Sequence, residues 1–429
     1  MEYFKVSGNN NLKGSVTISG NKNEALPVIA ATLLAREPVT LKNVPDITDV
    51  RIMLKTIESV GASVKYKDRH TVNIDTSVIK GNPDPELCRR IRASILLVGP
   101  LLARTGNVVL PPPGGDVIGR RRIDTHFLGF EQLGALYSVE GRDYKVVAHE
   151  LTGSEIFLDE PSVTATENII MAAAAARGRS VIHNAATEPH VQQLCIFMNS
   201  IGAEISGIGT NRLEIKGVEK FGGAVHETAP DYIEAGSFIA LAALSGSGVT
   251  IKKSGSRYMK KILQVFRKIG INTEIEGDDI YVPYHHKMKI VNDINNAIPK
   301  IDDGPWPAFP SDLMSIAIVA ASASEGTVLF FEKMFESRLF FVDRLIDMGA
   351  RIILCDPHRA VVTGPSQFTG TNLESPDIRA GMALLIAAVS AEGVSRIYNI
   401  QQIDRGYESI EKKLQRLGAD IGRHKIGDD

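Results

Sequence analysis

Six glycines recur at similar intervals along this 429-residue chain, and their repetition limits the possible folds more than any other feature. Each follows a helix-like stretch and precedes a β-like run, as in "IESVGASV" and "LQRLGADI". The six are Gly61, Gly134, Gly202, Gly270, Gly349 and Gly418. Glycine adopts positive φ without a Cβ clash, so the pattern predicts a helix, a left-handed cap and a strand in each repeat.

A second, alanine-rich helix also recurs six times, in copies such as "EALPVIAATLLA" and "ATENIIMAAAAA". Each copy is apolar nearly all round and is broken by Gly or Pro, as expected of a helix buried in a protein core. One repeat cannot bury its own apolar face, so neighbouring repeats must pack together. These runs are shorter than the ~20 residues of a membrane span, and several contain charges, so no membrane insertion is expected.

The repeats divide into two halves of three, which predicts two domains with a cleft between them. The first is expected at 22–229 and includes a Pro- and Gly-rich loop at 111–125. The second is expected to combine 1–21 with 230–429. The strand-like N-terminal segment could complete the sheets of this second half, because the last repeat lacks a clear second strand after Gly418.

Composition and short motifs exclude several function classes. A net charge of −2 gives no basic field for nucleic acid. Three cysteines, Cys88, Cys195 and Cys355, lack CxxC spacing, which predicts buried free thiols in a reducing cytoplasm rather than disulfides or a zinc site. The N-terminal segment has no apolar stretch typical of a secretory signal. Phosphate-loop, dinucleotide-binding and HExxH motifs are absent.

Basic residues recur at the edges of the repeats. They are Lys22, Arg92, Arg121, Arg338, Arg379 and Arg405. Singly, each is typical of a solvated surface. Together they would form a strong anion site, because the guanidinium group matches carboxylate and phosphate geometry.

Three aspartates accompany these cations. Asp312 and Asp377 each stand at a predicted helix start, where the alternative to acid–base chemistry is a simple capping role. Asp116 lies in the loop "VVLPPPGGDVIGRRRIDTHF", with no predicted helix directly after it. It could act as a general acid if burial raised its pKa, although the neighbouring arginines oppose that shift.

The chain resembles the enolpyruvyl transferase family from residue 4 to about 420. The resemblance rests on "SGNKNEALPVIAATLLA", "RASILLVGPLLAR", "PGGDVIGRRRIDTH", "FPSDL", "FESR" and "IDRGYE" in this order. It implies an α/β fold of the α+β type, with two similar inside-out, barrel-like α/β domains that close over substrate.

The resemblance also implies an activity. The enolpyruvyl group of phosphoenolpyruvate would pass to the 3-hydroxyl of UDP-N-acetylglucosamine with release of phosphate. This is the first committed step of peptidoglycan precursor synthesis, which serves cell-wall biogenesis, cell shape and division. The implied enzyme is cytoplasmic, needs no metal or organic cofactor, and has only small-molecule partners. A monomer is favoured, and the oligomeric state stays open.

Residue roles follow from the resemblance position by position. Lys22, Arg121 and Arg405 match residues that bind phosphoenolpyruvate, and Arg338 and Arg379 match arginines that neutralise the same anion. Asn23, Arg92 and Asp312 match residues that hold the sugar nucleotide. Asp312 is also the candidate base, while Asp116 and Asp377 match proton-transfer positions. The uridine diphosphate part would contact Arg121, Arg122, Ile123, Asp124, Thr125, Ser162, Val163, Thr164 and Met334.

Four departures from the family pattern affect this assignment. Asp116 replaces a residue that is often Cys, which predicts resistance to the epoxide antibiotic fosfomycin, because its covalent capture depends on that thiol. Arg122 stands where Pro is usual. Glu160 with Pro161, and Met314 in "SDLMS", also differ on the nucleotide side. Three alternatives therefore stay open: a shikimate 3-phosphate type of acceptor, a catalytically silent sugar-nucleotide-binding paralogue, and a structural solenoid.

Overall fold

The computed structural model describes residues 2–116, 118–245, 248–285, 287–425 and 427. The chain forms two compact units. Unit 1 consists of Met1–Ser19, Val117–Arg120 and Pro230–Asp429, and unit 2 consists of Gly20–Asp116 and Arg121–Ala229. Each unit has its own hydrophobic core, and the two cores share no residue.

The sixfold repeat is confirmed, and the fold is mixed α/β. The described strands form six small sheets, and each repeat contributes one. All six repeat glycines are left-handed, with φ from 91° to 109°. Each therefore ends a helix and turns the chain into the next strand, as the sequence predicts.

Unit 2 contains three repeats. Its helices are α1 (Lys22–Ala31), η1 (Thr32–Leu34), α2 (Thr48–Ser59), α3 (Pro85–Cys88), η2 (Arg92–Leu97), α4 (Val98–Thr105), α5 (Asp124–Gln132), α6 (Val163–Ala174) and α7 (Pro189–Ser200). Its strands are β3 (Val39–Lys42), β4 (Ser63–Asp68), β5 (Thr71–Asp75), β6 (Asn107–Leu110), β7 (Leu136–Glu140), β8 (Asp143–Val147), β9 (Glu155–Phe157), β10 (Arg179–His183), β11 (Glu204–Ser206), β12 (Arg212–Lys216) and β13 (Val225–Glu227). The sheet orders are β13-β3-β5-β4, β6-β8-β7 and β11-β12-β10-β9.

Unit 1 contains the other three repeats. Its helices are α8 (Tyr232–Ser245), η3 (Ser256–Tyr258), α9 (Lys260–Ile269), η4 (Ile294–Asn296), η5 (Ser311–Leu313), α10 (Met314–Ser322), η6 (Arg338–Phe341), α11 (Val342–Asp347), α12 (Ile378–Ser390), α13 (Gln401–Asp404) and α14 (Ile410–Leu417). Its strands are β1 (Glu2–Ser7), β2 (Gly14–Thr17), β14 (Val249–Lys252), β15 (Glu274–Glu276), β16 (Asp279–Val282), β17 (Lys300–Asp302), β18 (Gly326–Phe331), β19 (Arg351–Asp356), β20 (Arg359–Gly364), β21 (Asn372–Glu374), β22 (Val394–Tyr398) and β23 (Asp420–Lys425). The sheet orders are β21-β22-β1-β23, β15-β16-β14-β2 and β17-β18-β20-β19.

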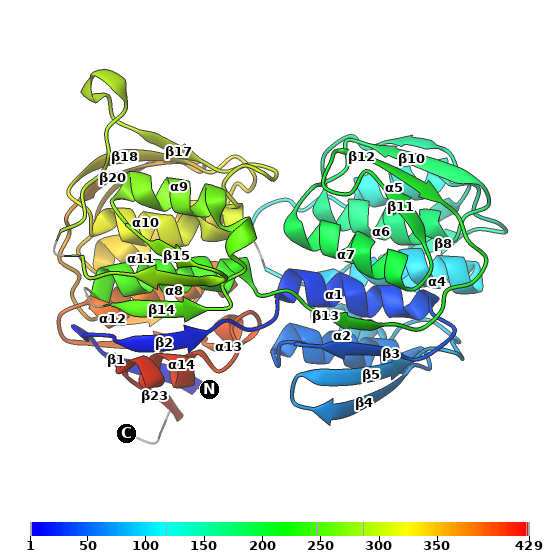
Figure 1. Cartoon of the computed structure of the whole chain (residues 1–429), viewed down its shortest axis with the longest axis horizontal. Helices are drawn as coiled ribbons and strands as arrows, with labels where there is room; N and C mark the ends of the chain where they lie inside the picture. The colour runs from blue at the N-terminus through cyan, green and yellow to red at the C-terminus, as the bar shows by residue number, and fades with distance from the viewer. Residues whose placement is uncertain (1, 117, 246–247, 286, 426, 428–429) are drawn as a thin grey trace. The chain divides into compact units, whose positions relative to one another are not determined.

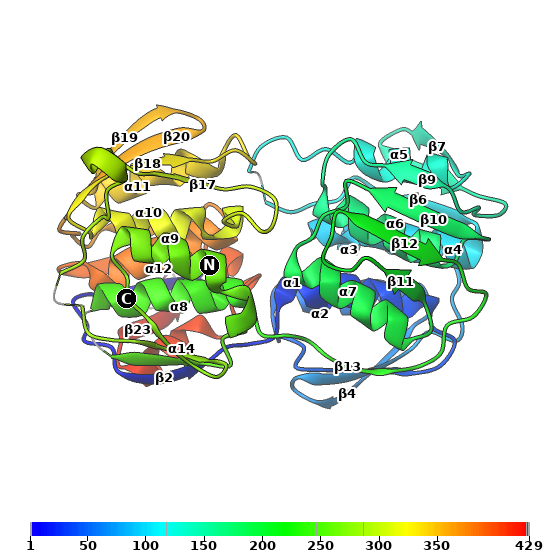
Figure 2. The same ribbon diagram turned by 45° about the horizontal axis from the view of Figure 1, so that its top comes forward.

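The apolar helices lie inside each unit and the sheets lie outside them (Figures 1 and 2). In unit 1, α8, α10 and α12 pack against one another, and in unit 2, α6 packs against η2 and α4. These helices carry small, apolar side chains on every face, which explains why they are buried. The six sheets remain separate, so the barrel-like description does not extend to a closed barrel among the described strands.

The N-terminal strands complete two sheets of unit 1, as expected. Strand β1 lies between β22 and β23 and pairs antiparallel with both. Strand β2 pairs in parallel with β14. In Figure 1 the blue start of the chain therefore lies beside red elements from its end. The strand that the last repeat lacks is supplied by β1.

The cysteine expectation is correct for two of three residues. Cys88 and Cys195 are buried free thiols, and burial raises the pKa of each to about 12. The prediction was wrong for Cys355, which is exposed because it lies, like Ile353, on the outward face of β19. Among the described residues, no helix combines the length and apolarity needed to cross a bilayer.

Candidate functional site

Lys22 is positioned by the cap of α1. The Asn21 side chain accepts hydrogen bonds from the backbone N–H groups of Asn23 (2.8 Å) and Glu24 (3.3 Å), which fixes where the helix begins. Lys22 therefore lies in the first turn, with Asn23 beside it. Its Nζ forms an ion pair with Asp49 of α2 at 2.9 Å, and both side chains are largely buried. Lys22 thus has a rigid position in unit 2.

Arg92, at the start of η2, approaches the 111–125 loop. Its Nη2 donates to the carbonyl oxygens of Arg121 at 2.7 Å and Arg122 at 3.3 Å. Burial lowers the pKa of Arg92 to about 10, and the nearby Arg121 charge lowers it further. Two cationic side chains are thus held close together, an arrangement that favours a bound anion.

The loop glycines allow this close approach. Gly115 has φ 109°, and a Cβ there would lie 2.8 Å from Cβ of Arg92. Gly119 has φ 125°, and a Cβ there would lie 2.2 Å from Oε2 of Glu336. Asp116 directly follows Gly115 and is half-buried. Gly115 therefore lets the loop backbone pack closely against Arg92, and Gly119 lets it pack closely against Glu336.

A polar cluster surrounds the start of α5. Arg122 donates to Asp124 Oδ2 and to Asp159 Oδ2, each at 3.1 Å. The Thr125 hydroxyl donates to Asp159 Oδ1 at 2.6 Å and contacts Glu160 Oε1 at 3.5 Å. Arg122 thus has acidic partners on both sides. Sequence reasoning missed Asp159, whose importance appears only when α5 and the segment before α6 pack together.

His126 was also missed, and it links α5 to α6. Burial lowers its pKa to about 3, so the imidazole is neutral. The Asn168 amide donates to Ile95 O (2.7 Å), and its Oδ1 accepts from Gly99 N (2.7 Å). Its Nδ2 therefore faces His126 Nδ1 as a donor at 3.0 Å. The ring proton is left on Nε2, which lies 3.2 Å from the Thr164 hydroxyl.

In unit 1, two arginines converge on Asp312. Arg379 donates from Nε (3.1 Å) and Nη2 (2.8 Å) to Oδ2, while Arg338 Nη2 donates to Oδ1 at 3.2 Å. Burial alone lowers the pKa of Arg379, but Asp312, Tyr407 and Asp231 together outweigh it and raise that pKa above its usual range. Asp312 lies in η5, which begins after Pro310. Its side chain binds two cations.

Glu332 supports this cluster from a fully buried position. Its carboxyl accepts from the Ser311 hydroxyl (2.9 Å) and from the backbone N–H groups of Met334 (3.2 Å) and Phe335 (3.1 Å). Burial raises its pKa to about 9, and a hydrogen bond with Asp303 adds to that shift. Glu332 therefore ties Ser311, next to Asp312, to the segment that carries Arg338.

The arginine–aspartate cluster concentrates positive charge. Two guanidinium groups share the Asp312 carboxylate, and burial raises the pKa of Glu332, whose Oε2 lies 3.9 Å from Arg338 Nε. Within the described residues, Arg338 Nε and Arg379 Nη1 are buried donors without a hydrogen-bond partner. Buried donors are rarely left unsatisfied, so this cluster is suited to an anionic ligand.

The remaining predicted residues have other local environments. Asp377 caps α12 by accepting from Arg379 N (2.8 Å) and Ala380 N (3.0 Å), which is the structural role considered from sequence. Arg405 Nη1 donates to Gln402 Oε1 at 2.9 Å. Met334 is partly exposed. Ser162 is the N-cap residue of α6, and Val163 and Thr164 begin that helix.

The structure thus groups the predicted residues into two sets. In unit 2, Arg92 bonds to the Arg121–Arg122 segment, which continues into Ile123, Asp124 and Thr125. In unit 1, Arg338 and Arg379 bond to Asp312. Lys22 pairs with Asp49, Asp377 accepts from the backbone N–H groups of Arg379 and Ala380, and Arg405 donates to Gln402.

The overall fold matches those of solved enolpyruvyl transferases. The crystal structure of the enolpyruvyl transferase NikO from Streptomyces tendae superposes with a TM-score of 0.88, covers 98% of each chain and is 23% identical. EPSP synthase from Acinetobacter baumannii gives a TM-score of 0.76 at 19% identity and covers 99% of this chain and 100% of its own. At these identities the likeness concerns the fold.

Sequence comparison defines the family. The family model for EPSP synthase (3-phosphoshikimate 1-carboxyvinyltransferase) matches residues 6–414. UDP-N-acetylglucosamine 1-carboxyvinyltransferase from Bradyrhizobium diazoefficiens is 55% identical over 98% of this chain and 97% of its own. The enzyme of that name from Borreliella burgdorferi is 53% identical over 99% and 100%. The chain belongs to this carboxyvinyltransferase family and is a transferase.

Proposed function

We propose that this protein transfers the enolpyruvyl group of phosphoenolpyruvate to the 3-hydroxyl of UDP-N-acetylglucosamine and releases phosphate. The relatives that carry this activity in their names are about half identical to the chain over nearly its whole length. The observation that carries the proposal is the cluster of two buried arginines, Arg338 and Arg379, around Asp312. An anionic substrate satisfies the donors that this cluster leaves without partners.

The chemistry requires one base and one acid. The sugar hydroxyl oxygen bonds to C2 of phosphoenolpyruvate and gives its proton to a carboxylate, while C3 gains a proton. Loss of a proton from C3 and of phosphate from C2 then restores the double bond. Asp312 is the proposed base, because two guanidinium groups hold its carboxylate at a fixed position. Asp116 is the proposed acid, and Asp377 a further proton-transfer residue.

The cations have a second role when phosphate leaves. Negative charge develops on the departing oxygens, and fixed cations stabilise it without reorganisation. In this proposal Lys22, Arg121 and Arg405 hold the phosphate, and Arg338 and Arg379 neutralise the same substrate. No metal or organic cofactor has a part in the reaction.

Most contacts of the acceptor are assigned to unit 2 and its polar cluster, and the others to unit 1. Asn23, Arg92 and Asp312 hold the sugar nucleotide, and Met334 contacts its uridine part. The 121–125 segment and the start of α6 carry donors at close range, as the Thr125–Asp159 and His126–Thr164 contacts illustrate. The departures at Arg122 and Glu160 fall in this cluster, where Arg122 has Asp124 and Asp159 as partners.

A phosphate-release assay tests the proposal. Turnover is expected with phosphoenolpyruvate and UDP-N-acetylglucosamine, and replacing the acceptor by shikimate 3-phosphate should abolish it. Asp312→Asn should lower kcat roughly 10²–10⁴-fold, the usual contribution of a general base. Asp302→Asn, an acid of the same unit outside the cluster, is the matched control and should retain activity. Turnover with shikimate 3-phosphate alone would favour the other acceptor, and no turnover would favour a silent paralogue.

The proposed biological setting follows from the reaction. Its product would enter peptidoglycan precursor synthesis in the cytoplasm, with consequences for cell shape and division. A monomer is proposed, and light scattering of the purified chain measures the oligomeric state directly.

A further inference from the structure

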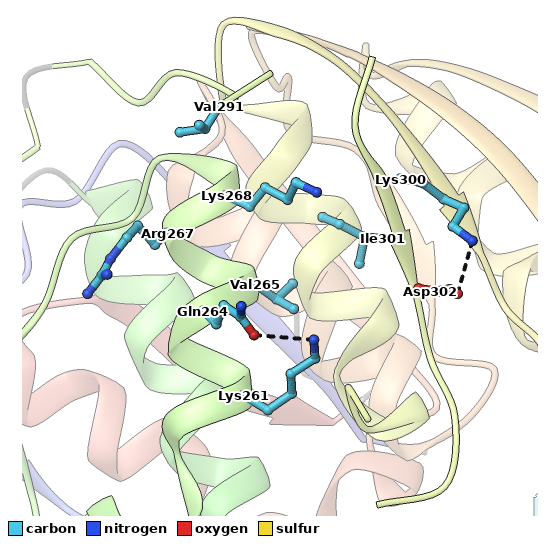
Figure 3. A pocket seen from close by; sticks show the side chains of 9 residues that line it. All are labelled: Lys261, Gln264, Val265, Arg267, Lys268, Val291, Lys300, Ile301 and Asp302. Atoms are coloured by element: carbon cyan, nitrogen blue, oxygen red, sulfur yellow. Dashed lines mark hydrogen bonds and ion pairs between the residues drawn. The ribbon is translucent and has the colours of Figure 1, made fainter. Parts of the chain in front are cut away.

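A cavity of about 340 Å³ lies in unit 1. It opens between α9 and the stretch from Val291 to the end of β17, as Figure 3 shows. The side chains that line it are Lys261, Gln264, Val265, Arg267, Lys268, Val291, Lys300, Ile301 and Asp302. Cavities that hold small organic ligands begin at roughly this volume.

Positive charge predominates around this cavity. Its lining contains four cationic side chains and one carboxylate, Asp302. Asp302 is already engaged by Lys300 at 3.1 Å and by Lys333. Lys268 pairs with Asp293 at 2.8 Å, whereas Lys261 donates only to the neutral Gln264 at 3.3 Å. The rim therefore keeps cationic charge that its own carboxylates do not balance.

The cavity also has an apolar wall. Val265 and Ile301 are buried core residues, and Val291 is exposed beside the opening. In Figure 3 Val265 and Ile301 lie between Lys261, Lys268 and Lys300, whereas Arg267 points away from the cavity. An inorganic ion would use only the rim. A ligand with both an anionic group and an apolar ring would also contact Val265 and Ile301 and remove the exposed side chain of Val291 from water.

We propose that this cavity is a binding site for an organic phosphate monoester that carries an apolar ring. The phosphate is held by Lys261, Lys268 and Lys300, and the ring lies against Val265 and Ile301. The site is separate from the proposed reaction, because none of these five residues belongs to the arginine–aspartate cluster or to the predicted substrate-binding positions.

Calorimetric titration of the full chain with 1-naphthyl phosphate at low salt tests this proposal. The triple variant K261Q/K268Q/K300Q should raise the dissociation constant at least about tenfold, a loss of about 1.4 kcal/mol. R267Q, on the same helix with its side chain directed away, is the matched control and should change it less than about twofold. Added salt should weaken binding, because these cations are exposed to solvent.

Two further probes separate the contributions of the ring and the charge. 1-Naphthol and inorganic phosphate should each bind more weakly than the ester. Equal affinity of inorganic phosphate and the ester would overturn the role of the apolar wall. Unchanged affinity in the triple variant would overturn the site itself. The triple variant should retain phosphate release and its unfolding midpoint, so failure of the proposed reaction would be distinguishable from failure of this proposal.

Discussion

At the scale of single residues, Asp116 determines whether an electrophile such as an epoxide can label the chain covalently. A carboxylate is a much weaker nucleophile than a thiolate, so the native chain should not be labelled by fosfomycin. Asp116→Cys places a thiol in the same Gly-rich loop. It should open the epoxide by forming a C–S bond, with the released oxygen taking a proton. Mass spectrometry should then find the adduct on the variant only; an adduct on the native chain at Asp116 would contradict the prediction.

Glu332 should affect stability in a pH-dependent way. Burial raises its pKa to about 9, well above the 4.5 of an exposed glutamate. Between these two pH values the unfolded chain has released the proton and the folded chain retains it, so stability falls as pH rises. The contribution is up to about 1.4 kcal/mol per pH unit. Glu332→Gln should remove this slope while keeping the Ser311 contact, as measured by urea unfolding from pH 5 to 9. An identical slope in the variant would refute a raised pKa.

The candidate site could be predicted only in part, for a physical reason. Arginine and aspartate are chemically distinctive residues, so Arg338, Arg379 and Asp312 stand out in the sequence. In the sequence, Glu332 in "FFEKM" cannot be distinguished from an ordinary solvent-exposed charged residue at the end of a strand. Its burial depends on Ser311 and Asp303, which reach it through tertiary packing. His126 was missed for the same reason, because Asn168 comes from another helix.

At the scale of elements, α1 and α8 begin with the same arrangement, a buried glutamate three residues after the capping residue. Glu24 and Glu234 are buried, and each follows the capping residue, Asn21 or Asp231, by three positions. Glu24 accepts the Ala229 N–H at 3.1 Å, and Glu234 accepts the Ser19 N–H at 2.8 Å. Each carboxylate therefore holds, within its own unit, the segment next to a chain crossing. The repeat extends beyond the apolar pattern to these polar contacts.

The ion pair between Glu234 and Lys413 allows the contribution of this arrangement to the unfolding free energy to be measured. Lys413 Nζ is largely buried and bonds to Glu234 Oε1 and to the Ser19 hydroxyl. Glu234→Gln should leave that ammonium group without its countercharge and lower the unfolding free energy by about 3 kcal/mol. The double variant E234Q/K413M should recover part of the loss, because the uncompensated charge is gone. Urea titration measures both, and equal stabilities of the native and E234Q chains would contradict the prediction.

Elements were more predictable than side-chain partners. The repeat glycines specify left-handed caps through local backbone sterics, which require no knowledge of the rest of the chain. The position of β1 followed from a strand missing after Gly418, a gap that a distant strand had to fill. The exposure of Cys355 could not be predicted in this way, because it depends on which face of β19 is turned to the core, and tertiary packing decides that.

At the scale of the whole molecule, the two hydrophobic cores have no residue in common. Phe238 of α8 is fully buried in the core of unit 1, and Phe197 of α7 is fully buried in that of unit 2. Truncation of either to alanine should cost about 3–5 kcal/mol, and only the unit that contains it should unfold earlier. Separate cores therefore predict two unfolding transitions rather than one.

The single tryptophan makes this prediction testable. Trp306 lies in unit 1, with its ring centroid 6.1 Å from that of Tyr232 at the start of α8, so its fluorescence reports on unit 1. Phe238→Ala should shift the urea midpoint of tryptophan fluorescence. Phe197→Ala should leave that midpoint in place and shift only part of the far-UV circular dichroism change. The two variants make the same substitution at equally buried positions, so they differ only in the unit that is changed. If both variants moved the fluorescence midpoint equally, the two cores would unfold as one cooperative structure, and the sixfold repeat would have to be treated as a single energetic unit.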